Sequence, residues 1–531
     1  MSKRTAILSV YDKTNVLALA KALVDADVEI LSTGGTYKYL LENKIPVISI
    51  SDYTGSPEIL EGRVKSLHPK IHGGILARRD REDDKQDLAS LGIAPIDFVI
   101  VNLYPFIAQI QKAHAEGNLD SLVEYIDVGG PTMLRAAAKN CRFVVSVCDA
   151  QDYSRIITCL TEGDFSLAFR QELAAKAFFT LSDYDAHVAQ YFSQGERVIG
   201  EDADKFSRYE AIHLEKTMGL RYGENPHQQA ALYRPWGNRD VPIWEQLQGK
   251  ELSYNNLVDT AAAVDLLLEF YSAKQSENSC VIIKHTNPCG AATRIHPLDA
   301  FIAARDCDPV SAFGGIVAFT GALDTPLAEE IVKGFVEVIA CERVEAEALS
   351  VLQKKKNIRL LKVDYLRLKQ TKEGVNSEIK KCLDGYLRQS SDNYTAAVLA
   401  SHLVAGDEGL VNSDLLAEIN FAWKLSKHVK SNAIVVTKNN QLIGVGAGQM
   451  NRVDSARISI TRLQSNGFTV QGAVAASDAF LPFPDTLEVL SAAGVRALVQ
   501  PGGSIRDEEV INCAKEKGVL MFFTGERHFR H

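Results

Sequence analysis

The feature that most constrains the fold is an alternation of short apolar runs with helical patterns across residues 1 to about 195. Such alternation predicts a parallel sheet, because parallel neighbouring strands need a crossover connection that is usually a helix. We expect strands at 5–10, 28–31, 46–50, 97–103 and 143–148, and helices at 14–25, 36–42, 84–91 and 132–140, with Thr14 and Thr36 as N-caps. The first part of the chain is therefore predicted to be an α/β domain.

Composition narrows the class of protein. A chain of 531 residues with 46% hydrophobic and 24% charged residues is typical of a soluble globular protein with two to four domains. The net charge of -9 disfavours a broad nucleic-acid surface, although a few local cations or backbone amides can still bind a phosphate. The apolar runs are too short for a signal peptide or a membrane span, so we expect a cytoplasmic protein.

The cysteines argue against two kinds of cross-link. Nine of them are scattered through the chain, and no two form a Cys-x-x-Cys pair. An odd and scattered set in a chain without a secretion signal indicates reduced thiols. We therefore expect neither a disulfide framework nor a structural metal site.

Two strand-to-helix junctions carry residues suited to phosphate. They read Ser-Val-Tyr-Asp-Lys-Thr at 9–14 and Ser-Thr-Gly-Gly-Thr at 32–36, and glycine lets backbone N–H groups approach an anion at a helix start. Either junction alone is more often a turn than a site. Because both follow strands of one predicted sheet, they suggest a ligand crevice at its carboxyl edge.

Further polar motifs follow at 62–69, 102–106, 127–130 and 135–140. The charged or proton-bearing groups that could converge on the crevice are Arg63, Lys65, Tyr104, Asp127 and Lys139. The alternative for Arg135 and Lys139 is a pair of surface side chains one helical turn apart.

A different kind of site is predicted at residues 280–292. An apolar, mostly β-branched strand ends at Lys284 and His285, and we expect Asn287, Pro288 and Gly290 to turn the chain there. An ammonium beside an imidazole suits attack by a weak nitrogen nucleophile on a carbonyl carbon. A zinc deaminase site is rejected, because the His-x-Glu and Pro-Cys-x-x-Cys elements are missing.

Residues 200–216 are rich in charge and lack a clear period, which is typical of a linker. Beyond them, Asn225-Pro-His predicts an exposed turn that presents Arg221 and Tyr222, and a helix is expected at 259–271. Two strands with a glycine-rich connection are predicted near 430–436 and 443–453, where close backbone packing is the default explanation for the glycines.

The motifs of the first half, taken together, resemble the IMP cyclohydrolase domain of the bifunctional purine biosynthesis family. They are Ser-Val-x-Asp-Lys-Thr, Ser-Thr-Gly-Gly-Thr, Gly-Arg-Val-Lys-Ser-Leu-His-Pro, Asn-Leu-Tyr-Pro-Phe and Asp-Val-Gly-Gly. The resemblance implies a methylglyoxal-synthase-like parallel sheet domain. It also implies ring closure of formylated AICAR (FAICAR) to IMP with loss of water.

The second half resembles the AICAR transformylase domain of the same family. The shared elements are Arg-Tyr-Gly-x-Asn-Pro-His-Gln, Lys-His-x-x-Pro-x-Gly, Gly-x-Gly-Ala-Gly-Gln and Ser-Asp-Ala-Phe-x-Pro-Phe. The resemblance implies paired cytidine-deaminase-like subdomains, a homodimer with sites at its interface, and formyl transfer from 10-formyltetrahydrofolate to AICAR, without a tightly bound cofactor. Nucleic acid and membrane partners are not expected.

The implied domains are 1–199 for cyclohydrolase, 200–216 for the linker and 217–531 for transformylase, whose halves divide near 370–390. An alternative remains in which the first domain only binds a nucleotide effector beside an active transformylase. Lys65, Tyr104, Asp127 and Lys139 argue against this alternative, because a binding module has no need of proton carriers.

Residue roles follow from the resemblance. For formyl transfer they fall on Lys284, His285 and Asn432, and for cyclisation on Lys65, Tyr104, Asp127 and Lys139, with the base either Asp127 or Lys139. The implied substrate-binding residues are Ser9, Lys13, Ser32, Gly34, Gly35, Thr36, Arg63, Ser66, Asn102, Gly129, Gly130, Arg221, Tyr222, Asn256, Phe313, Gly314, Arg452, Phe480, Asp485 and Arg527. Two departures from the family pattern are Pro484 in place of an arginine and the segment 339–342, which we expect to affect a folate-pocket loop.

Overall fold

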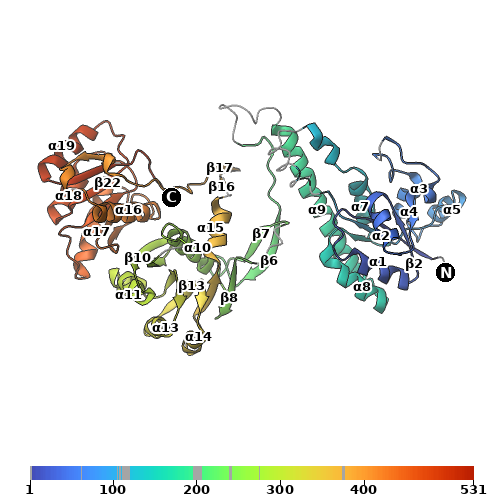
Figure 1. Ribbon diagram of the computed structural model, residues 1–531, viewed down its shortest axis with the longest axis horizontal. Helices are drawn as coiled ribbons and strands as arrows, with labels where there is room; N and C mark the ends of the chain where they lie inside the picture. The colour runs from blue at the N-terminus through green and yellow to red at the C-terminus, as the bar shows by residue number, and fades with distance from the viewer. Residues whose placement is uncertain are drawn as a thin grey trace. The chain divides into compact units, whose positions relative to one another are not determined.

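A computed structural model describes residues 3–60, 63–104, 106, 109, 120–194, 206–237, 242–273, 276–373 and 377–531. The chain forms two compact units (Figure 1). The first comprises Met1–Glu215 with Arg234–Gly237, and the second comprises Lys216–Tyr233 with Asn238–His531. Part of the predicted linker, 200–205, lies outside the described residues. No helix in the described part of the chain is long and apolar enough to cross a membrane.

The first unit is built on a five-stranded sheet in the order β3-β2-β1-β4-β5. All four pairings are parallel, which confirms the predicted α/β domain. The strands are β1 (Arg4–Ser9), β2 (Val28–Ser32), β3 (Ile48–Ser49), β4 (Phe98–Val101) and β5 (Val145–Val147).

Helices cover both faces of this sheet. Because side chains alternate along a strand, Ala6 and Leu8 of β1 pack under α1 and α8, whereas Ile7 packs under α4 and α7. The helices are α1 (Val16–Asp25), α2 (Gly34–Glu42), α3 (Ile50–Thr54), α4 (Pro69–Leu76), α5 (Glu82–Ser90), α7 (Gly129–Lys139), α8 (Tyr153–Glu162) and α9 (Leu167–Gln194), with short 3-10 turns at Asp120–Tyr125 and Ala150–Asp152.

Both predicted N-caps in this unit are wrong. Helix α1 is preceded by Asn15 in a left-handed conformation, and the N-cap position of α2 is Thr33, whose hydroxyl donates to Glu58 and not to the helix. Thr36 lies inside α2, where its hydroxyl donates to the carbonyl of Val10 over 2.8 Å. The tertiary contact with the β1 loop therefore takes the hydroxyl that the sequence pattern had assigned to a cap.

The second unit contains two six-stranded sheets with the same pairing pattern. The first runs β10-β9-β11-β13-β15-β8 and the second runs β20-β19-β21-β22-β23-β18. In that order each sheet has two antiparallel pairings, then two parallel ones, then one antiparallel. This duplication agrees with the paired subdomains that the resemblance implies.

The strands of the first sheet are β8 (Trp244–Gln248), β9 (Asn278–Lys284), β10 (Asn287–Arg294), β11 (Gly315–Phe319), β13 (Val336–Cys341) and β15 (Arg359–Val363). Those of the second are β18 (Leu403–Ala405), β19 (Ile434–Thr437), β20 (Leu442–Gly446), β21 (Val474–Ser477), β22 (Ala497–Gln500) and β23 (Leu520–Phe523). Separate two-stranded pairs are β6 (Leu214–Leu220) with β7 (Ala230–Pro235), β12 (Ala322–Leu323) with β14 (Arg343–Val344), and β16 (Ser377–Cys382) with β17 (Gly385–Ser390).

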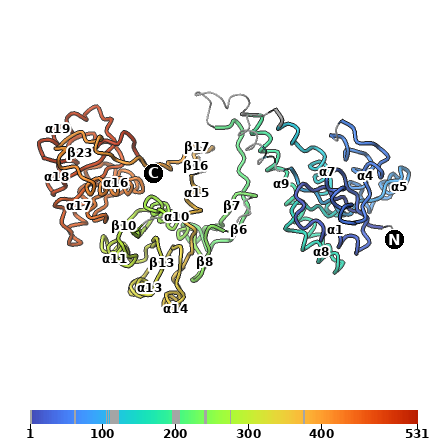
Figure 2. The backbone as a smooth tube through the Cα atoms, in the orientation of Figure 1, coloured from blue at the N-terminus to red at the C-terminus, as the bar shows by residue number. Residues whose placement is uncertain are grey.

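Helices α10 (Tyr254–Leu268) and α16 (Ser413–Lys427) share one apolar core with the inner faces of both sheets. The outer face of the first sheet is covered by α11 (Pro297–Cys307), α13 (Thr325–Ile331) and α14 (Ala346–Leu352), and that of the second by α17 (Arg452–Ser465), α18 (Asp485–Ala493) and α19 (Asp507–Lys517). The backbone trace in Figure 2 shows these helices outside their sheets. The remaining elements are α12 (Pro309–Ala312), α15 (Tyr365–Glu373) and two 3-10 turns at Ala400–His402 and Glu408–Leu410.

The repeat extends to a close helix–strand approach in each half. A side chain at Gly290 in β10 would overlap the carbonyl of Ala304 in α11, and one at Gly446 in β20 would overlap that of Ser455 in α17. The close packing predicted for the glycine-rich connection is confirmed at Gly446. Only glycine permits these two approaches without moving a helix.

Two further sequence expectations for this unit are wrong. Helix α10 starts at Tyr254, five residues before the predicted start, because Ser253 and Asn256 form a capping box. Residues 339–341 are not a loop but the buried end of β13, and the carboxylate of Glu342 accepts a hydrogen bond from Tyr271 over 2.7 Å.

Candidate functional sites

The first candidate site lies at the carboxyl ends of β1, β2 and β4. The Val10 amide donates to the Thr36 hydroxyl over 3.0 Å, and the Lys13 ammonium donates to the Val10 carbonyl. Burial lowers the pKa of Lys13, although the negative charge of Asp12 acts to raise it. The two predicted phosphate loops are thus joined to each other by direct hydrogen bonds.

Asn102, at the end of β4, holds the first loop from the other side. Its Oδ1 accepts from the Asp12 amide over 3.1 Å, and its Nδ2 donates to the Asp12 carbonyl over 2.9 Å. The rings of Tyr11 and Tyr104 then lie 5.1 Å apart, centroid to centroid. The loops after β1 and β4 therefore present Tyr104 beside the crevice.

Lys65 and Tyr104 both lie within electrostatic range of Asp127. The Lys65 ammonium would be 3.3 Å from a Cβ placed on Gly34, which itself has a φ of +54°. Burial raises the pKa of Asp127, and this outweighs the opposing effects of the Gly130 amide and of Lys65. Burial, followed by the charge of Asp127, raises the pKa of Tyr104. A partly desolvated carboxyl within electrostatic range of a cation and a phenol is suited to proton transfer.

The glycine pair that begins α7 fits tightly around this carboxylate. The Gly130 amide donates to Asp127 Oδ1 over 2.9 Å. A Cβ on Gly130 would lie 2.5 Å from Asp127 Oδ2, and one on Gly129 would lie 2.5 Å from the Ser66 hydroxyl. Small residues at both positions therefore leave room for the side chains of Asp127 and Ser66.

Other predicted residues lie apart from this cluster or are engaged elsewhere. Lys139 is the last residue of the 11-residue helix α7. At about 1.5 Å of rise per residue it lies about 15 Å along the helix axis from the first residue. There it lines a cavity of about 540 Å³ with His72, Arg135 and Phe178. Arg63 pairs with Glu124, and both side chains are exposed.

Arg135 is also paired, with Asp185, and so does not stand as a free surface cation. The Ser32 hydroxyl is buried and donates to the Leu8 carbonyl over 2.6 Å. Ser9 ends β1 and Gly35 lies in the first turn of α2 with open space around it. Of the predicted phosphate residues, Lys13, Gly34 and Gly35 therefore lie at the open edge.

The second candidate site is organised by the hairpin that joins β9 to β10. The turn consists of His285 and Thr286, with φ of 52° and 62°, so the prediction that Asn287, Pro288 and Gly290 make the turn is wrong. Two successive left-handed residues form a type I′ turn, which non-glycine residues adopt at a cost. Asp259 offsets that cost by accepting from the His285 amide over 3.3 Å and from the Thr286 amide over 2.8 Å.

Lys284 faces the outer side of the sheet. Ile282, two residues earlier in β9, belongs to the outer core, so strand alternation places Lys284 on that side. Its ammonium donates to the carbonyl of Phe313 over 2.6 Å, and the Gly314 amide donates to Phe335 over 2.8 Å. The catalytic candidate Lys284 and the binding candidates Phe313 and Gly314 thus form one contiguous group.

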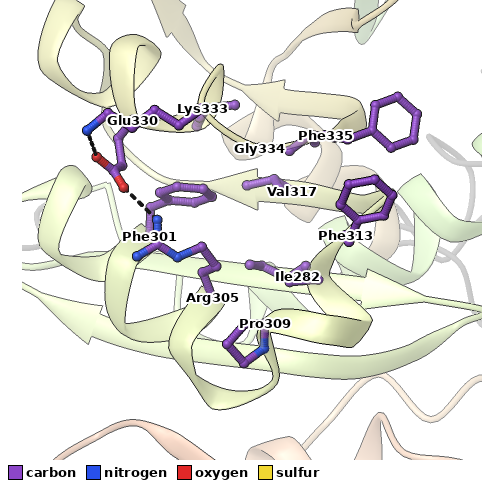
Figure 3. A pocket seen from close by; sticks show the side chains of 13 residues that line it. Ile282, Phe301, Arg305, Pro309, Phe313, Val317, Glu330, Lys333, Gly334 and Phe335 are labelled. Carbon is purple, nitrogen blue, oxygen red and sulfur yellow. Dashed lines mark hydrogen bonds and ion pairs between the residues drawn. The ribbon is translucent and has the colours of Figure 1, made fainter.

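A cavity of about 240 Å³ opens beside this group (Figure 3). Ile282 and Val317 form its floor, and the rings of Phe313 and Phe335 stand 5.3 Å apart at one end. At the other end Glu330 bonds both Arg305 and Lys333. The pocket is therefore apolar and aromatic with charged groups at its rim, a composition suited to a small aromatic ligand.

Three predicted binding residues surround the start of α10. The Arg221 guanidinium lies 5.0 Å from the centre of the Tyr222 ring, and the Tyr254 amide donates to the Tyr222 carbonyl. Asn256 is buried within the capping box, and its amide donates to Glu337 over 3.0 Å. Its side chain thus positions the helix start.

Asn432 follows α16 and is held near the β9–β10 hairpin. Its side-chain amide donates to the carbonyl of Gln449 over 2.8 Å. Two residues earlier, the Lys430 amide donates to Asn287 Oδ1 over 3.0 Å, and Asn287 Nδ2 donates to the carbonyl of His285 over 3.1 Å. Hydrogen bonds therefore link the segment that carries Asn432 to the turn that carries His285.

Asp478 is a functional candidate that sequence reasoning missed. This fully buried carboxylate accepts from the Ser431 hydroxyl, from the Ala433 amide over 3.2 Å and from Arg452 over 3.2 Å. It therefore fixes both neighbours of Asn432 and orients Arg452. The signal available in the sequence was an acidic residue directly after the buried strand β21, in the Ser-Asp-Ala-Phe motif.

The last predicted residues lie in loops at the same edge of the second sheet. Phe480 follows β21, and Asp485 begins α18, where its carboxylate accepts from the Thr486 amide over 2.7 Å. The Arg527 guanidinium lies 4.7 Å from the centre of the Phe529 ring. Arg452 bonds Ser477 and Asp478 at the end of β21 and lies 5.7 Å from the centre of the Phe529 ring.

The fold carries two separate candidate sites, one on a parallel sheet and one on a duplicated mixed-sheet unit, which is the arrangement expected of a bifunctional enzyme. Residues 137–462 match the family described as "AICARFT/IMPCHase bienzyme", and residues 15–132 match the "MGS-like domain". The chain belongs to the AICARFT/IMPCHase bienzyme family. The two matches meet near α7, whereas the compact units divide near residue 215.

Relatives support this over the whole chain. The bifunctional purine biosynthesis protein PurH of Aquifex aeolicus (strain VF5) is 44% identical over 527 residues, covering 99% of this chain and all of the relative. PurH of Anoxybacillus flavithermus (strain DSM 21510 / WK1) is 46% identical over 532 residues, covering 100% of both. The solved structure "Crystal structure of ForH" is 37% identical, covers 36% of this chain and 100% of that chain, and has a TM-score of 0.32.

The chain is accordingly a bifunctional enzyme of the last two steps of purine biosynthesis, a formyltransferase and an IMP cyclohydrolase. Its substrates are small molecules, and the formyltransferase step uses a folate-type cosubstrate.

Proposed function

We propose that the two reactions divide between the two units. Residues 217–531 transfer the formyl group of 10-formyltetrahydrofolate to the 5-amino group of AICAR, which gives FAICAR and tetrahydrofolate. Residues 1–199 then close FAICAR to IMP with loss of one water, and 200–216 link the two. The joining of Lys284, Phe313 and the His285 turn into one group carries the first assignment.

In formyl transfer the 5-amino group is a poor nucleophile, because its lone pair is delocalised into the imidazole. His285 accepts the proton that this nitrogen loses as it attacks. Lys284 stabilises the tetrahedral oxyanion or protonates the departing folate nitrogen, and Asn432 donates to the formyl oxygen. The fixed turn and the Phe313 contact support these roles, since both hold the reacting groups before substrate binds.

In cyclisation the carboxamide nitrogen attacks the formyl carbon of the same molecule. The protein then needs mainly to hold the reactive conformer and to move protons. Asp127 is the better candidate for the base, because it lies within electrostatic range of Lys65 and Tyr104, whereas Lys139 is at the opposite end of α7. Lys13 and the glycines of α2 receive the phosphate at a helix start.

We also propose a homodimer whose transformylase sites lie at the interface. Large apolar side chains are exposed in the segments that flank both sheets: Val310 and Phe313 at α12 beside the first sheet, and Met450 and Ile505 in the loops after β20 and β22 of the second. Such patches near a site are typical of protein–protein contacts. The cytoplasmic location stays a prediction from the sequence.

Mixing two inactive variants tests the shared site. If Lys284 and Asn432 of one site come from different subunits, an equal mixture of exchanged Lys284→Ala and Asn432→Ala dimers regains about a quarter of normal formyl transfer, because about half of the dimers are mixed and one of the two sites in each mixed dimer is intact. If both residues come from one chain, the mixture stays inactive. A monomer by analytical ultracentrifugation would reject the proposal outright.

Point variants test the division of labour. Lys284→Ala and His285→Ala should abolish tetrahydrofolate formation from AICAR and 10-formyltetrahydrofolate, while cyclisation of preformed FAICAR continues. The unmodified chain should release tetrahydrofolate and IMP in step. Accumulation of FAICAR instead would mean that residues 1–199 only bind a nucleotide, and loss of both activities in Lys284→Ala would reject two independent sites.

A further inference from the structure

Helix α9 contributes one buried phenol to the edge of the first candidate site. Tyr184 lies on this helix, is only 8% exposed, and reaches the backbone in front of α7 with its hydroxyl. The Asp127 amide donates to this hydroxyl over 2.8 Å, and the hydroxyl donates in turn to the Tyr125 carbonyl over 3.3 Å. One side chain therefore closes the backbone across residues 125–127.

This short segment leads directly into α7. Val128, whose side chain carries no acceptor atom, occupies the N-cap position of that helix. The Asp127 carboxylate instead accepts from the Gly130 amide over 2.9 Å, so its place depends on the backbone of Asp127 itself. The Tyr184 hydroxyl holds that backbone from the side of α9.

The ring of Tyr184 also contacts the loop that carries Tyr104. Its centre lies 6.0 Å from the centre of the Phe106 ring, and the Phe106 amide donates to the Tyr104 carbonyl over 2.8 Å. Aromatic pairs at this separation are stabilising. Tyr184 thus touches the segments from which both Tyr104 and Asp127 come, while its own ring stays buried.

Helix α9 itself is fixed against α7 on either side of Tyr184. Leu181, about one turn earlier, packs in a core cluster with Leu134 of α7, and the next residue, Asp185, pairs with Arg135 of α7. The phenol is therefore held at a set position relative to the start of α7. Rigid support matters for a proton-transfer group, because a displacement of about 1 Å can slow a reaction about 100-fold.

We propose that Tyr184 is a positioning residue for cyclisation: its hydroxyl holds the backbone of Asp127 where the carboxylate can take the substrate proton, and its ring supports the loop of Tyr104. The proposal rests on the proposed function of residues 1–199, with Asp127 as the base. Tyr184 does not touch the reacting atoms. Loss of its hydroxyl should therefore slow the chemical step and leave substrate binding unchanged.

The decisive variant is Tyr184→Phe, which keeps the ring and removes both hydrogen bonds. Tyr53→Phe is the matched control, since Tyr53 is a partly buried phenol of the same unit that accepts from the Ala94 amide over 3.3 Å. We expect Tyr184→Phe to lower the kcat for cyclisation of preformed FAICAR about 10-fold. The KM for FAICAR and the rate of formyl transfer should change by less than about twofold, and Tyr53→Phe should change none of the three.

A double-mutant cycle with Asp127→Asn tests whether Tyr184 acts through Asp127. If it does, Tyr184→Phe should slow the Asp127→Asn chain by less than about twofold, because the carboxylate that it positions is already gone. An equal fall of kcat in both backgrounds overturns the proposal. A raised KM with kcat unchanged, or the same fall of kcat in Tyr53→Phe, also overturns it.

Hydrogen–deuterium exchange followed by mass spectrometry gives a readout that does not depend on activity. Tyr184→Phe should speed exchange about 10-fold in a peptide that covers residues 125–128, and Tyr53→Phe should not. Unchanged exchange there overturns the proposal, and faster exchange throughout the first unit would indicate a structural role and overturn it as well.

The same variants separate this proposal from the proposed function. Normal cyclisation by Asp127→Asn would reject Asp127 as the base and the positioning role with it. Slow cyclisation by Asp127→Asn beside normal cyclisation by Tyr184→Phe would reject the positioning role alone.

Discussion

Replacing Glu269 with glutamine removes the carboxylate at the centre of a buried ion cluster in the second unit. Glu269 lies 3.0 Å from the Lys427 ammonium and 3.1 Å from His428 Nε2, and all three side chains are largely buried. Burial by itself raises the pKa of Glu269, but the hydrogen bond from His428, the charge of His428 and the charge of Lys427 outweigh it and lower the pKa to about 2. Burial lowers the pKa of His428, although the hydrogen bond to Glu269 opposes this.

The size of the effect follows from this shift. A fall from an ordinary 4.5 to about 2 corresponds to about 3 kcal/mol, and because part of that fall comes from the charge of His428, whose own pKa is lowered by burial, we expect the glutamine variant to lose about 2–3 kcal/mol at pH 7. A lowered pKa stabilises the fold above the unfolded value near 4.5, and that stability is lost as the pH falls toward 2. Near pH 3 the difference between the two proteins should therefore be about half its value at pH 7.

Urea unfolding followed by tryptophan fluorescence measures this difference. In a Trp236→Phe background the remaining tryptophans, Trp244 and Trp423, both lie in the second unit. Glu509→Gln is the matched control, because its pair with Arg506 is exposed and should contribute less than about 1 kcal/mol. A loss below about 0.5 kcal/mol at pH 7, or one that does not shrink at pH 3, would refute the reasoning.

Three further outcomes are expected. Asp127→Asn should slow cyclisation at least about 100-fold, and because burial raises the pKa of Asp127, the acid limb of the unmodified enzyme's kcat/KM should lie above the pH of an ordinary aspartate; an unshifted limb would remove Asp127 as the base. Gly446→Ala should lower the free energy of unfolding of the second unit by about 1–3 kcal/mol, and with it the melting temperature, because the new methyl overlaps the Ser455 carbonyl; an unchanged melting temperature by calorimetry would contradict that contact. Asp259→Asn should lower the kcat of formyl transfer about 10-fold with cyclisation unchanged, because asparagine keeps only one of the two side-chain oxygens that accept from the His285 and Thr286 amides; equal loss of both activities would point to misfolding.

The local sequence pattern was enough to predict much of the fold of the first unit. The alternation of apolar runs predicted the parallel sheet, since side-chain period and crossover length are properties of neighbouring residues. The motifs that follow the strands predicted that the loops of Lys13 and Thr36 gather at one edge, and the hydrogen bonds among these loops agree. The carboxyl ends of parallel strands meet at one edge of the sheet, so the position of a motif directly after a strand was enough to predict where in the fold it lies.

The tertiary structure decided what depends on distant partners. The turn falls at His285 and Thr286 because Asp259, on another element, accepts both of their amides. Lys139 lies away from Asp127 because an unbroken helix separates them. Asp478 acts on Arg452 and the neighbours of Asn432 only once β21 is packed beside β19. Hydrogen bonds and burial between segments that are remote in sequence leave no local sequence pattern. The sequence therefore shows which polar residues are present, but only the packed structure shows which partners they bind.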